Sequence, residues 1–259
     1  MEGEVKVSSY GYDGENGPLG WAGLSPNNSA CNRGRRQSPI VLNSSIPDAT
    51  QGPNLSFPTT EEADIENTGT TLTVIVNGTT TFGNKTYMHQ QFHFHTPSEH
   101  HIEGEYYPLE MHMVHESIDG SFLVLGLLFD LTEDASTTDL LSSVIENIDQ
   151  VQEPGARSST GRLDFAELSY SLQTMSLFEY SGSLTTPPCT EGINFLIMKK
   201  PMPLNVQTYS ALKKVMKFNS RYTQNTPGGI NLLEMAASQL GERIFFIELD
   251  DAPDLFTCL

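Results

Sequence analysis

The chain has 259 residues, with 14 Lys and Arg against 32 Asp and Glu, which gives a formal net charge of −18. This balance excludes nucleic acid and anionic membranes as partners, because phosphate binding requires clustered Lys and Arg. The longest apolar run, residues 122–129, is too short to span a bilayer as a helix. Because the chain has no internal repeat and no linker-like stretch, we expect residues 1–259 to form one domain.

Strand patterns dominate the chain. They fall on residues 71–76, 91–95, 110–115, 121–131, 193–198 and 243–249. The fourth of these segments is almost continuously apolar, which is typical of a central strand buried on both faces. Asp119-Gly120 stands just before it and predicts a hairpin turn from the preceding strand.

Two segments carry helix patterns. Residues 139–149 and residues 206–218 each place apolar side chains on one stripe, and Asn205 is a plausible N-cap of the second helix. Helices are therefore few and short. The sequence predicts an α+β fold in which β structure dominates, with a large, mostly antiparallel, twisted central sheet and a few short peripheral helices.

Three histidines stand on two of the predicted strands. His93 and His95 lie two residues apart, so their side chains point to the same face of the sheet. His112 stands on the next apolar run, and a neighbouring strand can bring it beside them. A lone strand histidine is usually a core or surface residue, but three converging imidazoles suit Zn²⁺. Three protein ligands leave a fourth position for water, which is typical of a catalytic rather than a structural zinc site.

Neighbouring polar side chains support this interpretation. Gln91 shares a face with His93, and Glu110 shares one with His112, so each can accept the second N–H of a ligating imidazole and fix its orientation. The other histidines break the alternation or lie between the strands, and we expect them to be supporting, structural or exposed: His89, His100, His101 and His115.

Sequons and cysteines favour a secreted protein. Five Asn-x-Ser/Thr triplets fall in the first third of the chain, at Asn27, Asn43, Asn54, Asn77 and Asn84. A glycan at any of them requires the secretory route. Cys31 and Cys189 can form one disulfide in an oxidising compartment, although sequence alone leaves the connectivity open. Cys258 is left over and is either free or paired with another subunit, so the sequence allows a homodimer.

The N-terminus shows no signal peptide. Residues 1–4 are acidic and lack an apolar stretch, so the protein is either intracellular or a mature form with an added Met. The sequons and cysteines favour the second of these readings.

Five segments, in order, resemble the α-class carbonic anhydrases, and in particular the secreted members with one disulfide. They are YGYDGENGPLGW (residues 10–21), RRQSPI (35–40), QFHFHTPSEHHIEGEYYPLEMHMVH (91–115), YSGSLTTPPC (180–189) and NSRYTQ (219–224). The resemblance covers nearly the whole domain to about residue 224, and beyond that point the chain diverges from the family. It implies reversible hydration of CO₂ to bicarbonate and a proton by attack of a zinc-bound hydroxide.

The resemblance also implies the residues that carry the reaction. His93, His95 and His112 are expected to bind Zn²⁺. Thr185 is expected to accept a hydrogen bond from the hydroxide and to donate its own hydrogen to Glu99, because a hydroxyl both donates and accepts whereas a carboxylate only accepts. Thr186 is expected to contact bicarbonate or inhibitors, and sulfonamide sensitivity follows from the same resemblance.

Further residues match positions around the family's active site. The residues expected to line an apolar CO₂ pocket are Val114, Val124, Leu184 and Phe195, the last in place of a common tryptophan. Tyr12 resembles the tyrosine of the active-site water network. His100 and Tyr180 resemble a buried pair beside Glu99 that supports the ligands. Cys31 and Cys189 match the disulfide of extracellular members.

One departure concerns proton transfer. Fast family members carry a histidine proton shuttle where this chain has Thr70, in the segment Asn67-Thr68-Gly69-Thr70. Threonine has no pKa near neutrality and cannot carry the proton as histidine does. The substitution predicts that proton transfer limits turnover unless another group takes over.

The sequence argues against two other functions. A non-catalytic binding or storage relative is disfavoured because all three expected zinc ligands are present together with Glu99 and Thr185. A dedicated zinc esterase or hydrolase is disfavoured because the chain has neither an HExxH helix nor a G-x-S-x-G elbow.

Overall fold

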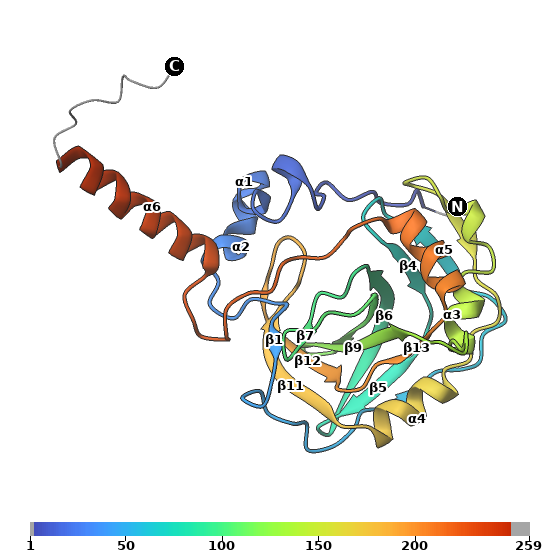
Figure 1. The fold of residues 1–259 in the computed structure, drawn as a ribbon. Coiled ribbons are helices and arrows are strands. Elements are labelled where there is room, and N and C mark those ends of the chain that lie inside the picture. The colour runs from blue at the N-terminus through green and yellow to red at the C-terminus, as the bar shows by residue number, and fades with distance from the viewer. Residues whose placement is uncertain (1–2, 250–259) are drawn as a thin grey trace.

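The computed structural model describes residues 3–249, and the side chains of residues 3–240. A sheet of eleven strands runs through this part of the chain, in the main order β10-β3-β4-β6-β8-β9-β12-β11, and a second sheet pairs β1 with β7 (Figure 1). The strands are β1 (Val41–Leu42), β2 (Asn54–Ser56), β3 (Asp64–Asn67), β4 (Leu72–Ile75), β5 (Thr79–Phe82), β6 (Lys85–His95), β7 (His101–Ile102), β8 (Leu109–Ser117), β9 (Phe122–Leu131), β10 (Arg157–Ser159), β11 (Leu177–Ser183), β12 (Glu191–Met198) and β13 (Met202–Leu204).

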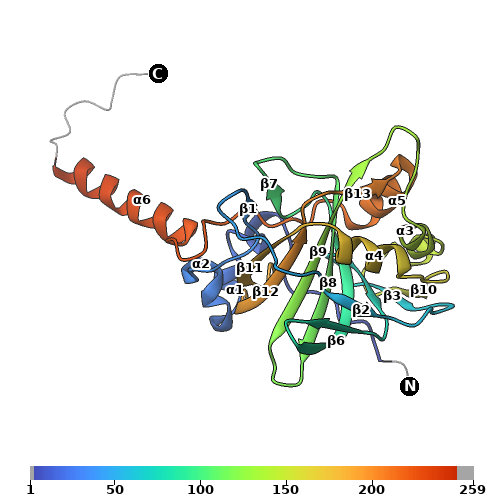
Figure 2. The same cartoon turned by 90° about the horizontal axis from the view of Figure 1, so that it is seen from below.

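Most of the large sheet is antiparallel, and the two parallel pairings within it are those of β9 with β12 and with β13. The helices lie around the sheet (Figures 1 and 2). They are α1 (Trp21–Leu24), α2 (Ala30–Arg33), α3 (Asp139–Val144), α4 (Ala166–Thr174), α5 (Val206–Met216) and α6 (Leu232–Leu249), with 3-10 turns η1 (Gly14–Asn16), η2 (Pro26–Ser29) and η3 (Ile148–Gln150). The predicted fold class is confirmed.

The two predicted helices are present but shorter than expected. Helix α5 begins after Asn205, whose side chain accepts a hydrogen bond from the Thr208 N–H at 2.7 Å, as the predicted N-cap would. It ends where Lys217 adopts a left-handed φ of 57°. Helix α3 ends at Val144, residues 145–147 form a turn, and the last two residues of the predicted segment belong to η3.

One predicted strand is wrong. Residues 243–249 form the end of helix α6, which lies beside α2 and then projects away from the sheet (Figures 1 and 2). A short apolar run fits a strand or a helix equally well, and the helix-forming residues before it decide the outcome. Asn231 caps this helix, because its side chain accepts a hydrogen bond from the Leu233 N–H at 2.9 Å. No helix within residues 3–249 is long and apolar enough to cross a bilayer.

The central strand β9 is buried on both faces, as predicted. Its residues Leu123, Leu125 and Leu127 enter one hydrophobic cluster, whereas Val124 and Leu128 enter another on the opposite face. The predicted hairpin is also present, since the Ser117 and Ser121 backbones pair around a Gly120 with φ of 78°.

A bulge in β6 sets which histidines share a face. The register against β8 shifts between His89 and Gln91, so Gln90 is an extra residue. Beyond the bulge Phe92 is fully buried on one face and His93 points to the other. Before the bulge His89 lies on the Phe92 side, with ring centroids 6.2 Å apart. Uninterrupted alternation would have placed His89 beside His93, so the expected reason for setting His89 apart, a break in the alternation of the sequence, is wrong, and the bulge is what removes it from this face.

Candidate metal centre

Three imidazole rings converge on one face of β6 and β8. His93 lies directly opposite His112 in the antiparallel register, and His95 follows two residues along β6. The ring centroids are 5.4 Å apart for His93 and His112, 4.7 Å for His95 and His112, and 5.1 Å for His93 and His95. A ligand nitrogen from each ring lies within 4.8 Å of the other two. The expected convergence of the three side chains is therefore present.

Two of the rings are oriented by Gln91 and Glu110, the two side chains that strand alternation predicted for this role. His93 Nδ1 donates to Gln91 Oε1 at 2.9 Å, and His112 Nε2 donates to Glu110 Oε1 at 2.7 Å. Each acceptor lies two residues from its histidine on the same strand. These contacts place the protons on His93 Nδ1 and His112 Nε2, because a carbonyl or carboxylate oxygen only accepts.

The third ring is held by the backbone. His95 Nδ1 donates to the Asn219 carbonyl at 2.9 Å. The three hydrogen bonds leave Nε2 of His93, Nε2 of His95 and Nδ1 of His112 for a cation. His95 Nε2 is buried and has no hydrogen-bond partner in the described part of the chain. A buried nitrogen lone pair without a donor is costly unless a ligand meets it, so this donor set fits a metal ion.

Electrostatics favour the neutral, metal-binding form at two of the three ligands. Burial lowers the pKa of His93 well below its ordinary value and lowers that of His95, and neutral imidazole is the form that binds metal. Burial also opposes protonation of His112, but the charge of Glu110, the hydrogen bond to Glu110 and the charge of Glu99 together outweigh burial and raise the pKa of His112. Burial opposes ionisation of Glu110 as well, yet the charges of His100 and His112 and their hydrogen bonds hold the pKa of this carboxyl well below its usual range.

Glu110 connects the metal-facing rings to the buried core. Its Oε2 accepts the backbone N–H groups of Glu99 and His100, both at 2.8 Å, and its Oε1 also accepts His100 Nδ1 at 2.7 Å. The His100 ring then meets the Tyr180 hydroxyl at 2.6 Å, which in turn lies 2.8 Å from Ser38 Oγ. The expected pair of His100 and Tyr180 is thus buried and close, but its carboxylate partner is Glu110.

Glu99 is fully buried and faces the histidine cluster. Its Oε1 accepts the Arg221 N–H at 2.9 Å. Its Oε2 lies 3.5 Å from His95 Nε2 and 3.9 Å from His112 Nδ1, with no hydrogen-bond partner among the described residues. Thr185 is also buried, but residues 3–240 show no hydrogen bond from its hydroxyl to Glu99. The proposed donation from Thr185 to Glu99 stays a prediction.

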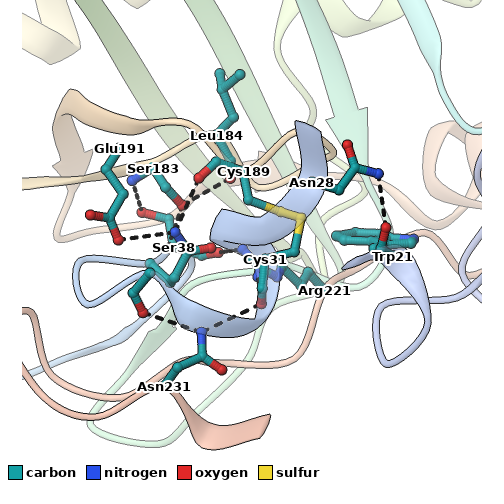
Figure 3. Close-up of a disulfide and its surroundings, with 12 residues drawn as sticks. Trp21, Asn28, Cys31, Ser38, Ser183, Leu184, Cys189, Glu191, Arg221 and Asn231 are labelled. Carbon is teal, nitrogen blue, oxygen red and sulfur yellow. Dashed lines mark hydrogen bonds between the residues drawn. A yellow bond between two sulfur atoms is a disulfide. The ribbon is translucent and has the colours of Figure 1, made fainter. Parts of the chain in front are cut away.

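A disulfide and a buried arginine fix the segment next to the site (Figure 3). Cys31 and Cys189 are bonded, with Cα atoms 5.1 Å apart, so the pairing implied by the family resemblance is confirmed. The Arg221 guanidinium donates to the Ser38 carbonyl at 2.8 Å and to the Cys31 carbonyl at 3.2 Å, and lies 5.6 Å from the Trp21 ring. Burial lowers the pKa of Arg221 to about 10, which still leaves it charged at neutral pH.

A cavity of about 660 Å³ opens beside the cluster. His93 and His95 are the histidines among its described lining residues, and Tyr12, Thr70 and Thr186 also line it. Neither His89 nor His101 belongs to this lining. Burial, and then the charge of Glu99, raise the pKa of Tyr12 well above its ordinary value, so its phenol keeps the proton at neutral pH.

The four residues expected to form an apolar pocket pack in one hydrophobic cluster: Val114, Val124, Leu184 and Phe195. Three of them form a row across neighbouring strands, because Val114 pairs with Val124 and Val124 pairs with Phe195. The Phe195 ring lies 6.1 Å from the His112 ring and stacks on Tyr180 at 5.1 Å. The cluster is therefore directly next to the histidine site.

Two functional residues were missed from the sequence. Asn219 accepts a hydrogen bond from His95 through its carbonyl, and its side chain donates to the Phe94 and Thr70 carbonyls at 2.8 and 2.9 Å. Arg221 supports Glu99 through its backbone N–H. Both lie in the NSRYTQ segment, one of the five segments that resemble the family, and this resemblance was the available signal. Their roles were not predictable from the residue pattern, because both act through backbone atoms.

Comparisons with known proteins place the chain in a family. A family model for eukaryotic-type carbonic anhydrases matches residues 16–228. A carbonic anhydrase from Pectobacterium carotovorum is 34% identical over 227 residues, which cover 85% of this chain and 89% of the relative. Among solved structures, the α-carbonic anhydrase of Aspergillus oryzae has a TM-score of 0.86 at 42% identity, with 90% of this chain and 99% of that one covered.

A second solved structure shows an inhibitor complex. The α-carbonic anhydrase of Thermovibrio ammonificans with sulfanilamide has a TM-score of 0.76 at 33% identity, with 84% of this chain and 96% of that one covered. The fold, the histidine cluster and these similarities agree, and the chain belongs to the eukaryotic-type, or α-class, carbonic anhydrase family.

Proposed function

We propose that the protein catalyses the reversible hydration of CO₂ to bicarbonate and a proton, with Zn²⁺ held by His93, His95 and His112. The observation that carries the proposal is the set of three imidazole nitrogens within 4.8 Å of one another, of which His95 Nε2 is buried and has no hydrogen-bond partner among residues 3–240. A bound zinc would supply a Lewis acid that lowers the pKa of water to about 7, an effect for which carbonic anhydrase is itself the established example.

The chain's own residues would hold the ligands and position the substrate. Gln91, Asn219 and Glu110 keep the three rings in orientation through the hydrogen bonds described above. Glu99, whose Oε2 faces the cluster, would accept a hydrogen bond from the Thr185 hydroxyl. Thr185 would then be fixed as an acceptor that orients the attacking oxygen.

The apolar cluster would provide the site for CO₂ itself. Its side chains offer no polar group that could hold a water molecule, which favours a small apolar substrate. They are Val114, Val124, Leu184 and Phe195. Thr186 in the cavity lining would contact bicarbonate or a sulfonamide, and Tyr12 would order water there.

The proton would leave this cavity without a histidine relay. Thr70 lines the cavity, and its Oγ1 lies 2.9 Å from Ser8 Oγ and 3.4 Å from Thr68 Oγ1. Hydroxyls can order water, but they do not titrate near neutrality. We therefore expect proton transfer to external buffer to limit turnover.

We also propose that the protein works outside the cytosol. The disulfide between Cys31 and Cys189 supports this location, because such bonds persist mainly in oxidising compartments. Of the five sequon asparagines, Asn27, Asn54, Asn77 and Asn84 are exposed, as acceptors of a glycan need to be, whereas Asn43 is half-buried.

The test is stopped-flow CO₂ hydration on zinc-loaded and chelator-stripped protein, with and without a sulfonamide. His95→Ala is the matched loss variant, and His101→Ala, which changes a histidine outside the cavity lining, is its control. We expect wild type to hydrate CO₂ only with zinc and to be blocked by the sulfonamide. His95→Ala should lose this activity, and His101→Ala should keep it. One bound zinc per chain without hydration would instead favour a non-catalytic binding or storage protein on this fold.

A further inference from the structure

One sequon contributes an exposed residue, Asn27, to the lining of the cavity beside the histidine cluster, and this exposed part of the lining is called its rim. Leu24, Ser25, Asn27 and Asn28 contribute one part of the cavity lining, and Thr186, Pro187 and Pro188 contribute another. The first of these parts contains the triplet Asn27-Asn28-Ser29.

The two asparagines of this triplet have opposite environments. Asn27 is exposed, and its side chain makes no hydrogen bond within the described part of the chain. Asn28 is 7% exposed, and its Nδ2 donates to the Trp21 carbonyl at 2.8 Å (Figure 3). The buried neighbour holds the turn, while the Asn27 amide is left free in solvent for modification.

The rim segment is fixed rather than loosely attached. η2 leads directly into α2, where Cys31 is bonded to Cys189, the residue that follows Pro188. Ser25 Oγ accepts the Asn27 N–H at 3.3 Å at the start of η2. Both parts of the lining are thus held together by one covalent link, and a group attached to Asn27 would be rooted at the cavity entrance.

The other sequons lie elsewhere. Asn54 is on the edge strand β2, Asn77 lies between β4 and β5, and Asn84 is at the turn from β5 to β6. Asn43 lies just after β1, and its Oδ1 accepts hydrogen bonds from the Ser45 N–H and hydroxyl. None of these four lines the cavity beside His93.

We propose that Asn27 carries an N-linked glycan that acts as a size filter on the cavity. In the attachment step, Asn27 Nδ2 forms a bond to the anomeric carbon of a lipid-linked oligosaccharyl diphosphate. The diphosphate leaves with the bonding electrons and Nδ2 loses one proton, so no oxidant or reductant is needed. CO₂, bicarbonate and a small sulfonamide pass the glycan, whereas a sulfonamide joined to a large polymer is hindered.

The experiment uses the full chain secreted from a eukaryotic host. Ser29→Ala removes the Asn27 sequon by changing an exposed hydroxyl, and Ser29→Thr preserves the sequon at the same position. Thr86→Val removes the Asn84 sequon on an exposed strand position and is the matched control away from the cavity. Glycopeptide mass spectrometry reads occupancy at each asparagine, independently of any activity.

The second readout is the association rate of a free sulfonamide and of the same sulfonamide linked to dextran. This part rests on the proposed function. We expect the dextran conjugate to associate about tenfold more slowly with wild type, Ser29→Thr and Thr86→Val than with Ser29→Ala. The free sulfonamide and CO₂ hydration should not distinguish the four proteins.

Two results would overturn the proposal: an unmodified Asn27 in a protein whose other sequons are occupied, or an occupied Asn27 with equal association rates for the conjugate. If no variant binds even the free sulfonamide, the proposed function fails, and the glycopeptide masses alone decide whether Asn27 is modified.

Discussion

Strands β6 and β8 carry histidines on both faces, and the two faces differ in chemistry. On one face, His93, His95 and His112 each have one nitrogen held by an oxygen and another directed at its neighbours. On the other face, His89 and His115 pack with ring centroids 4.9 Å apart in the hydrophobic core. The same residue type on the same two strands thus appears in two roles.

The nitrogens of His89 and His115, called the core pair below, do not converge on a common point. His115 uses both, contacting Thr80 Oγ1 at 2.9 Å and the Met113 carbonyl at 3.0 Å. His89 Nδ1 contacts the Val76 carbonyl at 2.9 Å, and only its Nε2 is left without a partner among the described residues. One free nitrogen among aromatic rings cannot build a zinc site, whereas three that converge beside a cavity can. Convergence of the free nitrogens and access to a cavity, rather than the presence of histidine, therefore define the metal centre.

Removal of a ligand should have the largest effect. His112→Ala is expected to weaken zinc binding by more than about 100-fold and to abolish hydration. This loss exceeds the one expected from removing a residue that only hydrogen-bonds a ligand. Competition with a chromophoric chelator measures the affinity, and His101→Ala is the control. Unchanged zinc affinity in His112→Ala would mean that the cluster on this face is not the metal site.

Removal of an orienting group should have a smaller effect. Gln91→Ala deletes the acceptor of His93 Nδ1 and should lower zinc affinity by about 10- to 100-fold. Gln90→Ala changes the adjacent, exposed bulge residue and should leave the affinity unchanged. Equal affinities for the two variants in the same chelator competition would contradict the role given to Gln91.

The core pair should instead govern acid stability. Burial lowers the pKa of His89 to about 4 and that of His115 to about 3, from an ordinary 6.5. Below pH 6.5 the unfolded chain binds protons that the folded chain does not. The free energy of unfolding is therefore highest above pH 6.5 and decreases as the pH falls, down to about 4 for the contribution of His89 and about 3 for that of His115. Between pH 8 and pH 5, His89→Phe should therefore lose about 2 kcal/mol less unfolding free energy than wild type.

Urea unfolding of wild type and His89→Phe at pH 8 and pH 5 checks this expectation. The two proteins should differ in how much unfolding free energy they lose between these pH values, whatever their difference at pH 8, where both rings are neutral. Parallel losses would show that the buried imidazole does not contribute to acid lability.

The smallest effect should come from the cavity wall. Thr70→His places an imidazole that titrates near neutrality in the cavity lining and should raise turnover in dilute buffer by about tenfold. Stopped-flow hydration over a range of imidazole concentrations checks this, with wild type expected to be rescued at high imidazole. Fast wild-type turnover in dilute, non-transferring buffer would show that another group already carries the proton.

Much of the site was predictable because it depends on strand alternation. The spacing of His93 and His95, and the two-residue offsets of Gln91 and Glu110 from their rings, fix faces that the fold then aligns. The fold class was predictable for the same reason, since long alternating or apolar runs indicate paired strands.

The remainder depends on features that carry no local pattern. The bulge at Gln90 reverses the face of His89, and strand periodicity cannot anticipate an extra residue. The carbonyl of Asn219 reaches His95 over 124 positions, through a backbone atom that every residue possesses. Residues 243–249 continue the helix that begins at Leu232, and their short apolar run does not by itself distinguish a strand from a helix.

X-ray absorption at the zinc edge tests the central claim most directly. For the zinc-loaded protein we expect one zinc per chain, with three imidazole nitrogens at about 2.0–2.1 Å, one further light atom and no sulfur. His112→Ala should lose this signature, and His89→Phe should keep it. A zinc bound through other ligands, or a signature that survives His112→Ala, would contradict the assignment of the metal centre to this face of β6 and β8.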